Sequence, residues 1–120
     1  MTDDKLTPME IMQRVSPAAA RSYMAFRATV LENAEVNALP EKVKLLIGIG
    51  VAASLQSSTC TLMWTRLAKK AGASDQEISE TIMVSRLMKA ATVNDAAADA
   101  LAWLLDHHDE GGAVRASAGN

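Results

Sequence analysis

The segment Leu39–Glu80, LPEKVKLLIGIGVAASLQSSTCTLMWTRLAKKAGASDQEISE, decides the fold. It predicts an apolar helix, a short polar break at Gln56–Thr59, a second helix that ends before Gly72, and the start of a third. Glycine directly after a helix is the residue that most readily takes the left-handed conformation of a C-terminal cap. Ser74 and Glu77 have the spacing of a capping box. The segment therefore predicts two helices and the start of a third, separated by short breaks.

Outside this segment, other start and stop signals complete the prediction. Thr7-Pro8 and Ser16-Pro17 each place a capping hydroxyl before a proline at the first helical position. Thr92–Asp95 is expected to interrupt or kink the helix that begins at the capping box. No stretch shows the alternation and turn residues of a strand ladder. The sequence predicts an all-α fold of about six helices.

Hydrophobic spacing predicts which faces are buried. In the helix after Ser16 the predicted stripe is Ala20, Tyr23, Met24, Val30 and Leu31, with Arg27 among them. In the central helix it is Val43, Leu46, Ile47, Gly50, Val51, Ser54 and Leu55, widened by Leu45, Ile49 and Ala52. In the helix after the capping box it is Ile78, Ile82, Met83, Leu87 and Met88. A last helix carries Ala98, Leu101, Ala102, Leu104 and Leu105, with Trp103 beside them.

Composition excludes several classes of protein. The formal net charge is −2 and the pI is about 5.6, so electrostatics give no reason to expect nucleic-acid binding. The longest apolar run, Leu45–Leu55, is about half of the roughly 20 residues that a membrane-spanning helix needs, and the acidic N-terminus does not resemble a secretory signal. A single cysteine cannot form an intramolecular disulfide and suits a reducing cytoplasm, the expected location. We expect a flexible arm at residues 1–6, one domain at 7–110 and a flexible tail at 111–120.

Gly48 and Gly50 lie inside the central helix, where each glycine costs roughly 1 kcal/mol relative to alanine. Such a cost is understandable if another part of the molecule approaches closely. We therefore expect another backbone, from the same chain or from a partner, to pack closely at these two positions.

Taken in order, these residues resemble the carboxymuconolactone decarboxylase family, which includes the alkylhydroperoxidase D-like proteins. The residues that carry the resemblance are Leu39-Pro40, Leu46-Ile47, Val51-Ala52, Ala68, Gly72-Ala73-Ser74, Glu77-Ile78 and Glu80. The strong part of the match covers about a third of the chain. The resemblance implies small helical subunits that assemble into trimers or hexamers, and it implies no cofactor.

The peroxidase branch of that family has the motif Glu-x11-Cys-x2-Cys-x3-His. Aligned on Ala68 and Gly72, the chain has Cys60 at the second, peroxide-reactive cysteine. Ser57 stands at the resolving cysteine, Trp64 at the histidine and Leu45 at the glutamate. Serine cannot form the disulfide, and the indole of tryptophan has no basic nitrogen. The resemblance therefore implies a nominal thiol peroxidase whose dithiol mechanism is excluded.

Cys60 is the candidate nucleophile, as a thiol in the first turn of a helix, although a buried structural cysteine is the more common case. Trp64 either walls a pocket or packs in the core. Arg27 and Arg86 are candidates to hold an anionic substrate, or else form ion pairs. The run His107–Glu110 suggests a metal, but adjacent helical residues point too far apart to share one ion, so no metal site is predicted.

Three functions stay open. The first is a one-cysteine peroxidase that depends on an external thiol reductant. The second is a decarboxylase-like enzyme that holds a small acidic metabolite through Arg27 or Arg86. The third is a non-catalytic homo-oligomer that binds a small-molecule ligand or serves as a scaffold.

Overall fold

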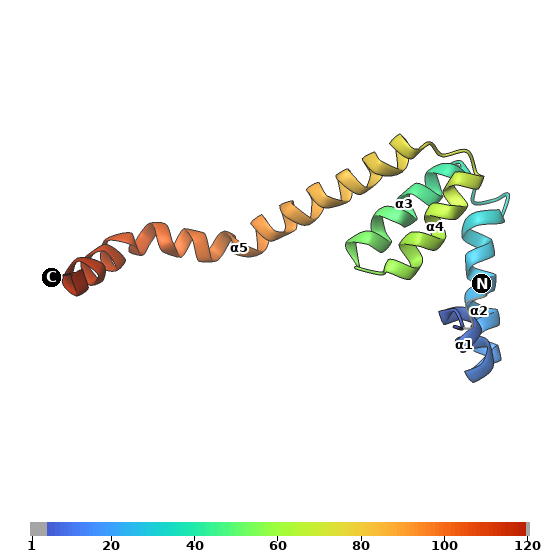
Figure 1. Cartoon of the computed structure of the whole chain (residues 1–120), viewed down its shortest axis with the longest axis horizontal. Coiled ribbons are helices and arrows are strands. Elements are labelled where there is room, and N and C mark those ends of the chain that lie inside the picture. The colour runs from blue at the N-terminus through green and yellow to red at the C-terminus, as the bar shows by residue number, and fades with distance from the viewer. Residues whose placement is uncertain (1–4, 120) are drawn as a thin grey trace.

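The computed structural model describes residues 5–119, and the side chains of residues 5–109. Its five helices are α1 (Pro8–Val15), α2 (Pro17–Glu32), α3 (Glu41–Ser54), α4 (Ser58–Lys70) and α5 (Asp75–Gly119). No strand occurs among residues 5–119, so the all-α prediction is confirmed. Helices α3 and α4 lie side by side, α1 and α2 form a separate hairpin, and α5 extends far beyond the other four (Figure 1).

The predicted start signals of the first two helices work as expected. The Thr7 hydroxyl accepts a hydrogen bond from the backbone N–H of Glu10 at 3.2 Å, and the Ser16 hydroxyl accepts one from Ala19 at 3.4 Å. In each helix the following proline occupies the first turn, where its missing N–H costs nothing.

The core lies where α3 meets α4 and the first turns of α5. It consists of the buried residues Leu45, Ile49, Ala68, Ala73 and Ile78, with Trp64, Leu67 and Ile82 packed against them. The prediction that α3 is buried on most sides is wrong for this chain alone, because Ile47, Val51 and Leu55 are exposed. The buried side of α3 is the one that carries Leu45 and Ile49, which we had assigned to the margin of the buried face.

Helix α2 also corrects the prediction, because Ala20 is its only buried residue. Tyr23 and Met24 are exposed, since α2 packs mainly against α1 and has little contact with the core. The ammonium group of Lys44 on α3 donates hydrogen bonds to the carbonyls of Val30 (2.7 Å) and Val36. These bonds tie the end of α2 to α3.

Helix α5 runs through Thr92–Asp95, where an interruption or a kink was expected, which is why residues 5–119 form five helices rather than six. These residues are only mildly poor helix formers, none is glycine or proline, and seven alanines lie between residues 90 and 102. The Thr92 hydroxyl donates a hydrogen bond of 2.7 Å to the carbonyl of Lys89. The predicted buried face holds for Ile78 and Ile82 but not for Met83, Leu87 and Met88, which are exposed.

The ends of the chain leave the domain prediction untested. Residues 1–4 of the expected arm lie outside the described residues. The expected tail is helical in its backbone to Gly119, and its flexibility stays a prediction. In the described part of the chain, no helix combines the length and apolarity that crossing a bilayer requires.

Candidate functional site

The C-terminal end of α4 is built by backbone geometry. Gly72 has a φ of +94°, its N–H bonds to the carbonyl of Lys69 at 3.1 Å, and the N–H of Ala73 bonds to the carbonyl of Ala68 at 2.9 Å. This pair of bonds is a Schellman cap. In such a cap, the two residues joined by the longer bond, here Ala68 and Ala73, usually make an apolar contact. Ala68 and Ala73 are both buried, at 0% and 3% exposure, so the cap also contributes to the core.

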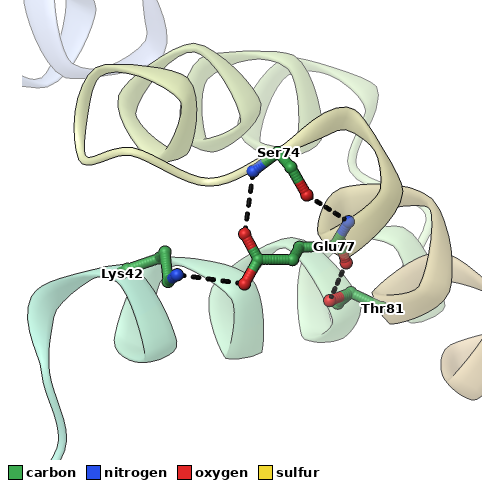
Figure 2. Close-up of polar contacts among 4 residues, drawn as sticks. All are labelled: Lys42, Ser74, Glu77 and Thr81. Carbon is green, nitrogen blue, oxygen red and sulfur yellow. Dashed lines mark hydrogen bonds and ion pairs between the residues drawn. The ribbon is translucent and has the colours of Figure 1, made fainter.

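The start of α5 is the predicted capping box (Figure 2). The Ser74 hydroxyl accepts a bond from the N–H of Glu77 at 3.0 Å, and the Glu77 carboxylate accepts one from the N–H of Ser74 at 2.9 Å. The second carboxylate oxygen of Glu77 pairs with Lys42 on α3 at 3.0 Å. The backbone bond from Ser74, followed by the bond from Lys42, lowers the pKa of Glu77 below its usual range. Glu77 therefore joins α3 to the junction between α4 and α5.

The two glycines of α3 are approached closely by side chains, and not by the backbone that the sequence predicted. A Cβ at Gly48 would lie 2.2 Å from the indole of Trp64, and one at Gly50 would lie 2.8 Å from the Ser85 hydroxyl. That hydroxyl donates a bond to the carbonyl of Gly50 at 3.1 Å. Gly48 is therefore what allows the Trp64 ring to pack closely against α3.

Cys60 lies in the first turn of α4, as predicted, and its side chain is exposed rather than buried. Ser57 is the N-cap of that helix, and its hydroxyl accepts a bond from the N–H of Cys60 at 3.3 Å. The serine at the resolving-cysteine position thus has a structural role of its own. It orients the backbone of the residue that would be the nucleophile.

Cys60 lines a cavity of about 590 Å³ between the α1–α2 hairpin and α4. Its lining residues are Pro8, Met9, Met12, Ala19, Tyr23, Met24, Arg27, Thr59, Cys60, Met63 and Trp64. The volume falls within the range of small-molecule sites, and most of the lining is apolar with a few polar groups, as in such sites. Four methionines give the lining an adaptable shape.

Arg27 is the only charged residue that lines this cavity among the described residues. It is half-buried, and its guanidinium carbon lies 5.9 Å from the centre of the Trp64 ring, at the distance of a cation–π contact. Trp64 is itself held against Gly48. The prediction that Trp64 either walls a pocket or packs in the core is resolved, because it does both.

The other predicted site residues lie elsewhere. Leu45, at the glutamate position, is 1% exposed in the core and does not line the cavity. Arg86 lines a second groove between α4 and α5 and contacts the Met83 sulfur at 3.8 Å, so the two arginines cannot hold one carboxylate. His107 stacks on Trp103 at 4.2 Å between ring centres, and His108 pairs with Asp109 at 3.0 Å. Within residues 5–109 no three His, Cys, Asp or Glu side chains gather as metal ligands would.

The sequence did not indicate that α1 and the face of α2 with Tyr23 contribute to the site. Met9, Met12 and Tyr23 line the cavity, but hydrophobic spacing assigned Tyr23 to a buried stripe. Their periodicity is the same for a cavity wall as for a core face. Only the position of the α1–α2 hairpin beside α4 separates the two interpretations.

Comparisons with known proteins agree on the family and the fold. The model of the carboxymuconolactone decarboxylase family matches residues 17–106. A crystal structure of a protein from Methanobacterium thermoautotrophicum is 26% identical in sequence, with a TM-score of 0.67, over 73% of this chain and 96% of that one. A comparison with curated proteins found no match.

Proposed function

Because the chain belongs to the carboxymuconolactone decarboxylase family, we propose that it uses the cavity beside Cys60 to bind a small, largely apolar molecule that carries a carboxylate. The observation that supports this proposal most is the single guanidinium, Arg27, in a cavity lined otherwise by methionine, aromatic and small side chains. Arginine pairs with a carboxylate through two parallel hydrogen bonds, and such bonds are roughly twice as strong as neutral ones.

The contact between Arg27 and Trp64 supports the same ligand. The indole holds the guanidinium at the cavity wall, so less side-chain freedom is lost when a carboxylate binds. The apolar lining contributes affinity in proportion to the apolar surface of the ligand that is buried. A compact aromatic or alkyl carboxylate matches both features.

The experiment is a fluorescence titration of a Trp103→Phe variant, in which Trp64 is the only tryptophan. Benzoate and octanoate are the probes, and benzamide and octanol are their uncharged counterparts. We expect the acids to change Trp64 emission and to bind at least about tenfold more tightly than the neutral compounds. Equal binding of the acids and the neutral compounds would contradict the proposal.

Arg27 has a matched control in Arg86, which lies in the other groove. Arg27→Gln is expected to weaken binding of the acids about tenfold or more, and Arg86→Gln to leave it unchanged. Similar effects of the two substitutions would mean that overall charge, not the cavity, holds the acid. An enzyme that decarboxylates such an acid needs this binding step too, so turnover of a bound acid would extend the proposal.

A second candidate function is one-cysteine peroxide reduction, which the exposure of Cys60 at the cavity favours. The Cys60 thiolate would attack one peroxide oxygen and break the O–O bond, giving a sulfenate and releasing an alcohol or water. An external thiol would then form a mixed disulfide with loss of water, and a second thiol would release Cys60. Loss of turnover of an organic hydroperoxide with dithiothreitol in Cys60→Ser tests this route, and turnover that survives contradicts it.

The lone free cysteine also supports the cytoplasm as the proposed location, because thiols stay reduced there.

A further inference from the structure

The far half of α5, orange to red in Figure 1, projects from the other helices. It carries large apolar side chains that the other described residues leave exposed. Leu101, Leu104 and Leu105 are 54%, 54% and 76% exposed. Isolated helices in water are marginal, and most helical stability in proteins comes from packing of an apolar face. The projecting segment therefore needs a partner surface.

Many of the apolar residues of α5 lie on one side of the helix, whereas Met88, Val93 and Trp103, which are also exposed, lie on other sides. At 100° per residue, less than half of the helix circumference carries the set that we call the α5 stripe. It consists of Met83, Val84, Leu87, Ala90, Ala91, Asn94, Ala97, Ala98, Leu101, Leu104 and Leu105. The residues that pack on α3 and α4, Ile78 and Ile82 among them, lie on a different side of the helix.

The α5 stripe reads nearly the same in both directions from Asn94. Leu87 and Leu101 are each seven residues away, and alanines stand three and four residues away on both sides. A two-fold contact repeats the same patch on both partners, so its sequence must be self-complementary. The occupant that fits this pattern is a second copy of α5.

We propose that α5 pairs antiparallel with α5 of a second copy, with the two-fold axis passing near Asn94. The alanines allow the two helices to approach closely where they cross, and the larger side chains fill the space where they diverge. Leu87 then lies beside Leu101 of the other copy, and the projecting half of each helix is supported by the near half of the other.

Polar groups on the stripe favour the antiparallel direction. The amide of Asn94 carries both donors and an acceptor, so two copies can bond to each other across the axis. Glu80 and His108 are each fourteen residues from Asn94, so antiparallel pairing places the carboxylate of one copy beside the imidazole of the other. Parallel pairing would place Glu80 beside Glu80 and would align the helix dipoles unfavourably.

Disulfide cross-linking of the full chain tests the direction of pairing. In a Cys60→Ser background, a size-tagged Leu87→Cys protein is mixed with untagged Leu101→Cys and mildly oxidised. We expect the mixed dimer as the main product, because the antiparallel axis places these two positions side by side. Ala96→Cys, on the opposite side of α5, is the control and should give no cross-linked product. Leu87→Cys dimers alone, or no product, would overturn the proposal.

The mass of the particle in solution provides the second measurement. Leu101→Glu is expected to weaken pairing at least about 100-fold and to halve the mass, because each contact would gain two unpaired carboxylates. Trp103→Ala, on another side of the same helix, should leave the mass unchanged. A two-fold pair occurs within a hexamer of three dimers but not within a simple trimer. A wild-type monomer or trimer, or an unchanged mass for Leu101→Glu, would overturn the proposal.

Discussion

The two ends of α4 differ in what their residues do. At the C-terminal end, the residues from Ala68 to Ile78 form a Schellman cap and a capping box that direct the chain into α5. At the N-terminal end, Ser57, Cys60 and Trp64 surround or support a cavity. The first region holds residues that carry the resemblance to the family, whereas the second holds Ser57 and Trp64, where the resemblance implies a cysteine and a histidine in the peroxidase branch.

This difference shows that the residues by which a chain resembles its family need not be those that would perform the reaction. Gly72, Ala73, Ser74 and Glu77 have backbone and core roles that any active site on this fold would require. Ser57 caps α4, and Leu45 lies in the core. The residues at the C-terminal end of α4 therefore indicate the family. The function has to be argued from the residues at the N-terminal end.

The largest expected effect on stability tests whether residue 45, which aligns with the glutamate of the peroxidase branch, can accommodate a carboxylate. Leu45→Glu would restore that carboxylate, but residue 45 is 1% exposed in the core. Burying a carboxyl group without a partner should lower the free energy of unfolding by about 4 kcal/mol. Denaturant unfolding measures it, with Leu45→Met, expected to cost less than about 1.5 kcal/mol, as the control.

A variant Leu45→Glu that is as stable as Leu45→Met would mean that this position opens to water. In that case the N-terminal end of α4 would be closer to the peroxidase pattern than the core contacts of Leu45 indicate.

The second effect concerns the support of Trp64. A Cβ at Gly48 would lie 2.2 Å from the indole, so the ring would have to shift away from α3. Overpacking costs about 1–3 kcal/mol, while alanine favours the helix by about 1 kcal/mol relative to glycine. Gly48→Ala should therefore lower the free energy of unfolding by about 1 kcal/mol. It should also weaken acid binding, because Trp64 positions Arg27.

Gly50→Ala is the matched control for that experiment. Its Cβ would meet the Ser85 hydroxyl at 2.8 Å, and a hydroxyl can rotate away. We expect stability close to that of the wild type and unchanged acid binding. Equal losses in the two variants would show that α3 tolerates no side chain on this side, and that Trp64 has no special position.

The sequence predicted the C-terminal end of α4 well because its signals are local. The glycine, the capping hydroxyl and the glutamate three residues later act within one turn, so their spacing is sufficient. The family resemblance and the first-turn position of Cys60 depend on the same short-range order. The exposure of Cys60 and its cavity depend on where α1 and α2 lie. The spacing of residues in the sequence does not predict that position.

The errors in buried faces have one physical origin. Hydrophobic periodicity shows which face of a helix avoids water, but not whether the same chain or a second copy covers it. Met83 and Leu87 were assigned to the interior and are exposed in the single chain. Both belong to the α5 stripe, where pairing of two copies would cover them. The expected interruption at Thr92–Asp95 does not occur, because the surrounding alanines outweigh four weak helix formers, and the alternative of a kink stays a prediction.

A smaller effect is expected at the capping box. Ser74→Ala removes the acceptor of the Glu77 N–H and should lower stability by about 1 kcal/mol, the usual cost of losing such a cap. Thermal or denaturant unfolding measures it. Ser79→Ala, on the exposed side of the same helix, should be nearly neutral. A neutral Ser74→Ala would mean that the Schellman cap alone sets the start of α5.

The smallest effect is a dependence of stability on pH that arises at Glu77. Its pKa in the folded chain is lowered, chiefly by the backbone N–H of Ser74 and then by Lys42. The folded state therefore gains stability above the usual carboxyl pKa, and this gain is lost as the pH falls through the lowered folded value. Glu77→Gln keeps an acceptor for the Ser74 N–H but no titrating charge, so its stability should fall less than that of the wild type on acidification.

Unfolding midpoints between about pH 6 and pH 3 measure this difference, with Glu80→Gln on the same helix as the control. Asp75 also loses stabilisation in acid, because its bond and attraction to Lys69 lower its pKa, but that contribution is common to all three proteins. The difference in unfolding midpoint between Glu77→Gln and the wild type should therefore shrink as the pH falls. The corresponding difference for Glu80→Gln should change less. If the difference in unfolding midpoint for Glu77→Gln does not change with pH, Glu77 stabilises the junction through hydrogen bonding and packing and not through its charge. The charge of the carboxylate, and with it the contact to Lys42 on α3, would then contribute nothing to the order at this end of α4.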